Sequence, residues 1–449
     1  MKRVKLSLIT AAISLALSQS AIAEDLLTVY DLAALNDPSI KAAFADRNAA
    51  REFKPQAQSR LVPLIEGLLN VKATDRKLNS NPLSSDVNTN DEFENFGYQL
   101  NLTQHVYHHD DWVGLKIADA EVAEANAKYA AAEQALATRT VQAYFNVLTA
   151  WENAKFTQVE KTSTNRQLDQ TKKRFEVGLI SVTDVNEAQA RYDLSVANEI
   201  RARNDLSKSQ EQLRQITNKY QTSFNTLGES FHLINPVPAS IDDWSDFAVT
   251  RNPELKSAEY KSEAARQEVN KQRAGHYPIV DFIGNIAYDK SNQDSAGDPQ
   301  TEQNSIEFQM RVPIFQGGLI SANTRAAAHQ HESAKEQLIQ QRRKVISDTR
   351  QAFLDVQANI SRTKALEQAV RSNRSSLEAT QSGFEVGTRT IVEVLNAQTA
   401  YHQAVRDAAQ ERYQYIINTV KLKQAAGTLT KADIQQINAW LGTRISVSS

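Results

Sequence analysis

Apolar residues recur at helical spacing along most of the chain, over stretches far longer than an ordinary globular helix. Neither proline nor glycine occurs from residue 116 to residue 177, and no proline occurs after Pro313. The pattern predicts one helix over about 111–177, which would be roughly 100 Å long at 1.5 Å per residue, and a second over about 319–382. Helices of this length need lateral neighbours, because intrinsic propensity alone does not hold them in place.

Pairs of apolar residues within the second long helix repeat every seven residues, as Leu338-Ile339, Val345-Ile346 and Ala352-Phe353. Adjacent residues point about 100° apart on a helix, so each pair forms two neighbouring rows. Two rows suit a helix that packs against neighbours on both sides, as in a cylinder, better than a coiled coil with one seam. A single wide core stripe is the alternative interpretation.

Four shorter segments alternate between apolar and polar residues, which predicts β-strands at 65–74, 96–107, 279–289 and 304–315. One apolar and one polar face over about ten residues is typical of outer-membrane strands, although half-buried soluble strands look alike. Polar loops at 75–95 and 290–303 favour the membrane interpretation, as do aromatic residues near the strand ends: Tyr107, Trp112, Tyr277 and Phe315. Four strands are too few for a membrane barrel, whereas three copies would supply twelve and leave room for a pore.

An internal repeat divides the chain. Phe175-Glu176-Val177-Gly178 recurs as Phe384-Glu385-Val386-Gly387 (384 − 175 = 209), and 142–147 matches 351–356 at the same offset. We therefore expect two copies of one unit, at 24–235 and 236–428, each with a helix of about 35 residues, two strands, a long helix and a further helix. The remaining residues, 429–449, are expected to form a short helix and a mobile end.

The amino terminus and the composition indicate export. Lys2, Arg3 and Lys5 precede an apolar run that closes with Ala21-Ile22-Ala23, so residues 1–23 are predicted to be a secretory signal peptide. There is no cysteine, and the formal charge is only −2, or −5 once the three basic residues of that segment are removed. This charge argues against a nucleic-acid partner. No later segment has the roughly 18 uninterrupted apolar residues of a transmembrane helix, so membrane insertion would need strands.

Four sequence segments, at 167–193, 211–218, 312–320 and 383–400, together with the duplication, resemble the TolC family of outer-membrane efflux and type I secretion channels. The resemblance covers essentially the whole mature length. It implies a mainly α homotrimer with a small β part: a twelve-stranded barrel in the outer-membrane lipid of a Gram-negative bacterium, continuing into a periplasmic tube of twelve helices. It also implies two further partners, a periplasmic adaptor and an inner-membrane pump or ABC exporter.

The resemblance further assigns roles to residues near two expected helix-hairpin tips. The tips that dock the adaptor correspond to Val177, Gly178, Leu179, Val386, Gly387 and Thr388. The gate at the periplasmic entrance corresponds to Arg389, Thr183, Asp184, Lys173 and Phe384, among which Arg389 with Thr183 and Asp184 is the pair best supported. Lys173 and Phe384 replace a glutamine and a tyrosine of the family. The constriction, which two aspartate rings line in the family, corresponds to Glu393 and Asn396.

Two histidine-containing motifs resemble metal sites, but their spacing does not favour metal binding. Residues 107–112 (YHHDDW) lie at an expected strand-to-helix junction, and His329-Gln330-His331 lacks the separation of three or four residues that ligands on a helix need. We also find no nucleophile elbow or phosphate-binding glycine loop, so neither a cofactor nor enzymatic activity is expected. The alternative to a channel is a soluble periplasmic adaptor or scaffold built of helical hairpins.

Overall fold

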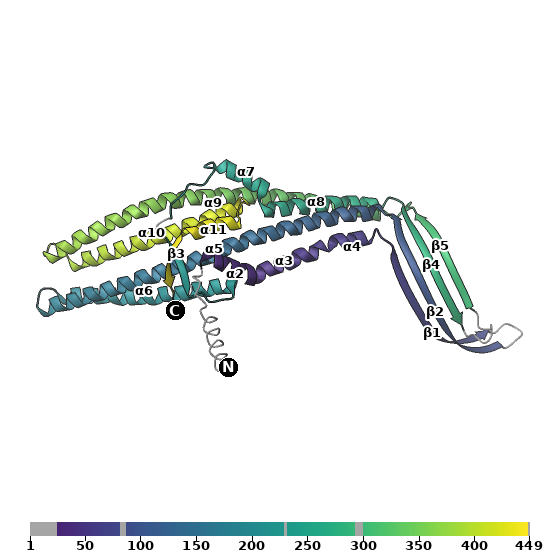
Figure 1. The fold of residues 1–449 in the computed structure, drawn as a ribbon, viewed down its shortest axis with the longest axis horizontal. Coiled ribbons are helices and arrows are strands. Elements are labelled where there is room, and N and C mark those ends of the chain that lie inside the picture. Colours follow the sequence, from purple (N-terminus) through teal and green to yellow (C-terminus); the bar gives the residue numbers. More distant parts are fainter. Residues whose placement is uncertain (1–24, 81–86, 229–230, 292–299, 448–449) are drawn as a thin grey trace, which may run out of the picture. The chain divides into compact units, whose positions relative to one another are not determined.

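The computed structural model describes residues 25–80, 87–228, 231–291 and 300–447 (Figure 1). The chain divides into two compact units. The hairpin unit comprises residues 1–44, 129–253 and 342–449, and the sheet unit comprises residues 45–128 and 254–341. The predicted signal peptide, 1–23, lies outside the described residues. The fold is mainly helical with a small strand part, as expected.

Two long helices each run through both units, α5 (His109–Glu176) and α9 (Leu319–Glu385), and each turns back into a shorter helix within the hairpin unit, α6 (Val182–Thr217) and α10 (Ile391–Ala425). No helix among the described residues is both long and apolar enough to cross a membrane. The expected 35-residue helices are instead divided into shorter ones: α2 (Leu26–Asn36), α3 (Pro38–Arg51), α4 (Phe53–Ser59), α7 (Ile241–Arg251) and α8 (Pro253–Ala274). Breaks fall before Pro38 and Pro253, because proline pushes the preceding residue out of helical geometry.

The core of the hairpin unit is centred on two buried tyrosines. The hydroxyl group of Tyr144 accepts a hydrogen bond from the Asn225 N–H and donates one to the carbonyl of the same residue, both at 2.9 Å. The hydroxyl group of Tyr415 does the same with the backbone of Ile234, at 3.0 and 2.7 Å. Each long helix pair is thereby fixed to the segment that connects the two halves of the chain, and burial raises the pKa of Tyr144 well above its usual value.

Small hydroxyl side chains form part of the packing toward the end of α5. Thr157, Thr164 and Thr171 are buried and lie seven residues apart, so they share one row of the helix. Each donates its hydroxyl to a carbonyl four residues earlier, and Thr164 also lies 2.8 Å from the hydroxyl of Ser195 on α6. These short side chains allow the two helices to approach closely.

A two-stranded sheet covers part of the core in the hairpin unit. Its strands are β3 (Ser223–Leu227) and β6 (Leu441–Ser446), which pair antiparallel with Phe224 opposite Ile445. The end of the chain follows α11 (Lys431–Ala439) into β6. The short helix of the tail therefore lies where it was expected. The prediction of a mobile end is wrong for the residues up to Val447, because β6 pairs with β3.

The sheet unit contains an antiparallel four-stranded sheet in the order β1-β2-β4-β5. Its strands are β1 (Leu64–Ser80), β2 (Val87–Tyr107), β4 (Ile279–Ser291) and β5 (Gln300–Arg311). The register pairs Leu69 with Tyr98 and Tyr98 with Tyr288, whose rings stack 5.2 Å apart. Apolar residues of all four strands therefore share one face, and polar residues such as Asn101 and Asn285 share the other.

The strand bounds differ from those expected. Much of the predicted loop 75–95 continues β1 and β2, because backbone pairing extends to Ser80 opposite Val87 where alternation is weak. β5 begins at Gln300 and ends at Arg311, so 312–315 is not strand. Pairing of β5 stops opposite Ile279, the first residue of β4. Alternation of side chains marks where a strand has two faces, but the paired backbone decides where it ends.

Candidate functional site

The expected docking tips are the two turns that close the hairpins, α5–α6 and α9–α10. At the first, the Gly178 N–H donates to the Phe175 carbonyl (2.9 Å) and the Leu179 N–H to the Arg174 carbonyl (3.0 Å). At the second, the Gly387 N–H donates to Phe384 (3.1 Å) and the Thr388 N–H to Gly383 (2.8 Å). Both glycines are left-handed, with φ of +75° and +81°, a conformation that side chains with a Cβ rarely adopt.

Reciprocal hydrogen bonds start the helix that follows each turn. The Asp184 carboxylate accepts from the Ser181 N–H at 2.9 Å, and the Glu393 carboxylate accepts from the Thr390 N–H at 2.7 Å. The cap side chains complete a capping box at both places. These bonds satisfy backbone donors that the first turn of a helix leaves unpaired, so both tips are rigidly specified by sequence.

Apolar side chains project at both tips. Val177, Leu179 and Val386 are each at least 70% exposed, although they are large and hydrophobic. The reversal of the chain places them beside glycines that leave the backbone accessible. Each tip therefore offers a small apolar surface next to uncovered backbone groups, which suits contact with another helix end.

Arg389 and Glu393 form an ion pair within one chain, with Nη1 2.7 Å from Oε1. Hydrogen bonds from the Thr390 backbone, then from Arg389, lower the pKa of Glu393 to about 2. The resemblance places Glu393 in the constriction and Arg389 in the gate, whereas in the folded chain the two side chains form one ion pair. Asp184 is engaged by Ser181. The proposed contact of Arg389 with Thr183 and Asp184 stays a prediction about the assembled protein.

Two contacts that the sequence did not reveal join the first hairpin to the second. The Arg191 guanidinium on α6 donates to Asn396 Oδ1 on α10 at 2.6 Å. The Arg174 guanidinium, at the end of α5, lies 4.3 Å from the centre of the Phe384 ring on α9. Lys173, the neighbouring gate candidate, is exposed in the last turn of α5. Both arginines stand within the 167–193 motif, but their partners lie more than 200 residues away, so spacing could not pair them.

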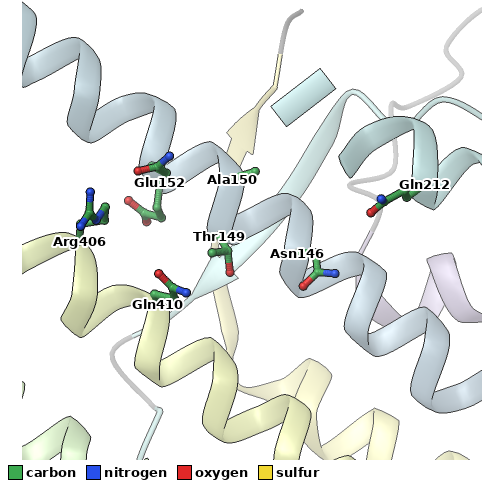
Figure 2. A pocket seen from close by; sticks show the side chains of 8 residues that line it. Asn146, Thr149, Ala150, Glu152, Gln212, Arg406 and Gln410 are labelled. Atoms are coloured by element: carbon green, nitrogen blue, oxygen red, sulfur yellow. The ribbon is translucent and has the colours of Figure 1, made fainter. Parts of the chain in front are cut away.

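A separate hollow of about 470 Å³ in the hairpin unit is lined mainly by polar side chains (Figure 2). Asn146, Thr149 and Glu152 come from α5, whereas Arg406 and Gln410 come from α10. Burial raises the pKa of Glu152. Glu152 lies 24 residues before the end of α5 at Glu176 (176 − 152), or about 36 Å along the helix. The hollow is thus distinct from the tips, and its amide and hydroxyl groups suit hydration rather than chemistry on a bound molecule.

Long hairpins closed by glycine turns, together with a sheet that exposes an apolar face, define the class of channel-forming envelope proteins. Residues 29–219 and 244–428 match the model of the family described as outer membrane efflux protein. The chain belongs to this family, and the resemblance drawn from its motifs is confirmed. It is accordingly an outer-membrane efflux protein and not an enzyme.

Curated relatives match nearly the whole chain. Outer membrane protein TolC of Vibrio cholerae is 34% identical over 446 residues, covering 98% of this chain and 99% of its own. Outer membrane protein TolC of Escherichia coli is 35% identical over 437 residues, covering 95% and 87%. The Campylobacter jejuni CmeC outer membrane channel superposes with a TM-score of 0.77 at 18% identity, covering 94% of this chain and 90% of that one, which shows the same fold.

Proposed function

We propose that this chain is one third of an outer-membrane exit channel for efflux pumps, type I secretion systems or both. The apolar face of its four-stranded sheet is the observation that carries the proposal. Ile306, Phe308 and Met310 on β5 are 77%, 71% and 66% exposed, which is costly in water but favourable against lipid. The opposite face, with Asn101 hydrogen-bonded to Asn285 at 2.6 Å, would line an aqueous pore.

The open edges of this sheet support a homotrimer. β1 and β5 are the outer strands of the order β1-β2-β4-β5, so each has a paired and an unpaired side. Unpaired backbone groups cannot remain in the hydrocarbon region, and β1 of one copy could pair with β5 of the next. Three copies give twelve strands, the smallest closed arrangement of whole chains that leaves room for a pore.

The duplicated sequence supports two copies of one unit per chain, 24–235 and 236–428, which would supply twelve long-helix positions to a periplasmic tube. Its entrance would be gated at the tips by Arg389, Thr183, Asp184, Lys173 and Phe384 and narrowed by Glu393 and Asn396. The contacts Arg191–Asn396 and Arg174–Phe384 belong to the same region and would help to hold the hairpins together when the entrance is closed.

The exposed apolar tips at Val177, Leu179 and Val386 support docking of a periplasmic adaptor, which in turn would connect the channel to an inner-membrane pump or ABC exporter. The family description and one relative's name support both uses. The family is described as outer membrane efflux protein, and the Alkaline protease secretion protein AprF of Pseudomonas aeruginosa is 27% identical over 430 residues. The cargo would therefore be drugs and other small molecules, or secreted proteins.

Purification from outer membranes tests the proposal. The mature protein should need detergent and form ion-conducting channels in planar bilayers. It should migrate as a trimer on unheated gels and, after heating, as a monomer slightly smaller than the 50.1 kDa of the whole sequence. A stable monomer that fractionates with soluble periplasmic proteins would instead support the alternative of a helical-hairpin adaptor or scaffold. Conductance by the trimer distinguishes a channel from a scaffold that is merely bound to the membrane.

A further inference from the structure

Two histidines and an aspartate meet in the sheet unit where strand gives way to helix. His105 lies near the end of β2, His108 lies just before α5, and Asp281 lies on β4. The strand register places His105 directly opposite Asp281, and a β-bulge between His105 and Tyr107 turns the chain toward the helix. The three side chains are the only group of three potential metal ligands found among the described residues, with ligand atoms all within 4.8 Å of one another.

The Nε2 atoms of both histidines lie near one carboxylate oxygen of Asp281. Nε2 of His108 lies 2.8 Å from Oδ1 of Asp281, and Nε2 of His105 lies 3.9 Å from the same oxygen. The two imidazoles stack with their centres 3.9 Å apart and their planes 9° apart, so one ring has to rotate for both Nε2 lone pairs to meet at one ion. Ligands of a tetrahedral zinc ion, at about 2.0–2.1 Å from the metal, are about 3.3 Å apart. The observed separations of 2.8 and 3.9 Å lie on either side of that value.

A buried carboxylate supports His105 from behind. Oδ2 of Asp111, in the first turn of α5, lies 2.7 Å from Nδ1 of His105, and the Asp111 side chain is only 3% exposed. With the proton on Nδ1 donated to this carboxylate, Nε2 carries the lone pair and faces Asp281. This carboxylate–histidine arrangement is the usual support of a metal-bound imidazole, because it fixes the tautomer and the ring orientation.

The charges around this group also favour a bound cation. Asp111 and Asp281 are 3% and 14% exposed, and the guanidinium of Arg60 lies 3.7 Å from Asp111 but is itself 64% exposed. Carboxylates removed from water need compensating charge nearby. Hydrogen bonds between His108 and Asp281 and between His105 and Asp111 account for the two closest contacts, and a bound cation would join the two pairs and supply the compensating charge.

We propose that His105, His108 and Asp281 bind one divalent transition-metal ion of the Zn²⁺ class, with Asp111 as the positioning residue for His105. Two imidazoles and a carboxylate suit Zn²⁺, Co²⁺ or Ni²⁺ rather than Ca²⁺ or Mg²⁺, which prefer sets of oxygen ligands. The ion would join β2, β4 and the start of α5 on the polar face of the sheet. It would therefore stabilise the strand-to-helix junction by joining His108 to Asp281, which lies 173 positions later in sequence.

Sequence spacing alone could not identify this site. Of the two histidines in the run 107–112, only His108 belongs to the group, while His109 packs against Tyr277 instead. The other ligands are a histidine on the preceding strand and an aspartate brought in by strand pairing. His329, from the second motif, is exposed and lies 3.5 Å from Glu332.

Calorimetry on the full-length mature trimer, purified in detergent without a histidine tag and stripped with EDTA, tests the site with Zn²⁺ as the probe. We expect one Zn²⁺ to bind per chain. When Co²⁺ is used in place of Zn²⁺, the complex should show the visible absorption of a site with a low coordination number. His105→Gln, His108→Gln and Asp281→Asn should each weaken binding at least tenfold. Asp111→Asn should weaken it by about 10–100-fold while retaining one ion per chain, as for other residues that orient a ligand.

His109→Gln and His329→Gln are the matched controls and should bind Zn²⁺ as the wild type does. The gel mobility of the trimer and its helical circular dichroism check that each variant folds; the three ligand variants are independent, so a folding defect in one leaves two measurements. Wild-type affinity retained in all folded ligand variants, no stoichiometric binding by the wild type, or loss of binding in His109→Gln would overturn the proposal.

Discussion

The two hairpin tips share one backbone design but differ in charge. Equivalent positions lie 209 residues apart, so Gly178 corresponds to Gly387, Ser181 to Thr390 and Asp184 to Glu393 (393 − 184 = 209). Turn hydrogen bonds, left-handed glycines and capping boxes are the same at both. A single local solution to reversing a long helix has thus been used twice.

The difference lies in Arg389, whose counterpart at the first tip is Ile180 (389 − 209 = 180). Arg389 reaches Glu393 at 2.7 Å and passes so close to Gly383 that a Cβ on that glycine would lie 2.7 Å from the arginine side chain. The first tip has Arg174 in place of that glycine, and Arg174 contacts Phe384 of the other hairpin. The comparison teaches that the two turns share one backbone geometry, while their arginines make different contacts.

The largest effect is expected from a branched side chain at either turn glycine. Gly387→Val should raise amide exchange at residues 386–389 by about tenfold, because left-handed backbone costs an L-residue roughly 1–2 kcal/mol. Gly178→Val should raise exchange at residues 177–180 equally, since both positions have open space around the glycine and only the backbone is strained. Hydrogen–deuterium exchange with mass spectrometry measures both. A large effect at one tip alone would break the equivalence of the two turns.

Arg191→Gln removes an observed contact between the hairpins, and Arg389→Ser would remove the contact proposed for the gate. Arg389→Ser and Arg191→Gln should each increase the ion conductance of the isolated channel in a planar bilayer, by about twofold to fivefold, as expected for exposed polar contacts. Arg201→Gln, which changes an exposed arginine elsewhere on α6, is the control. Unchanged conductance in Arg389→Ser would remove Arg389 from the gate and leave it a tip residue that stabilises the start of α10.

A smaller change is expected from Asn396→Asp, which would add a second acidic ring next to the one proposed for Glu393. The affinity of a trivalent blocking cation for the channel should rise by roughly twofold to threefold, because rings of acidic side chains around a pore attract cations. Asn396→Ala removes the hydrogen-bond acceptor of Arg191 without adding charge. This variant therefore distinguishes the effect of the added acidic charge from the effect of losing the contact between the hairpins. Equal block in wild type and Asn396→Asp would place residue 396 away from the constriction.

The smallest effect is a titration at the second tip. The pKa of Glu393 is lowered from 4.5 to about 2, so its charged form is favoured by the fold. The stabilisation is present above about pH 4.5 and is lost as the pH falls through about 2. Carbon-13 NMR of the labelled carboxyl group should show this low pKa, and Arg389→Ser should raise it only in part because the Thr390 backbone is the larger cause. An ordinary pKa in the folded wild type would contradict the observed cap geometry.

Sequence patterns predicted the tips and the long helices because both depend on local chemistry. Gly178, Gly387 and the two cap residues determine their turns within a few residues, and α9 begins at Leu319 as its pattern predicted. Pairing across the chain could not be predicted in this way. Arg191 contacts a residue 205 positions away, and His108 contacts one 173 positions away. β6 pairs with a strand more than 200 residues earlier. Only the strand register and the helix packing select these partners.

The threonines of α5 have a consequence for how a hairpin can move. Thr157 and Thr171 turn their hydroxyls back to their own helix, and Thr164 does so while also meeting Ser195, so the row presents only short side chains to its neighbours. Such contacts are close but shallow, as in the small-residue interfaces of membrane helices. A row of this kind interlocks less than a row of leucines would, so it should resist the sliding of one helix along another less strongly.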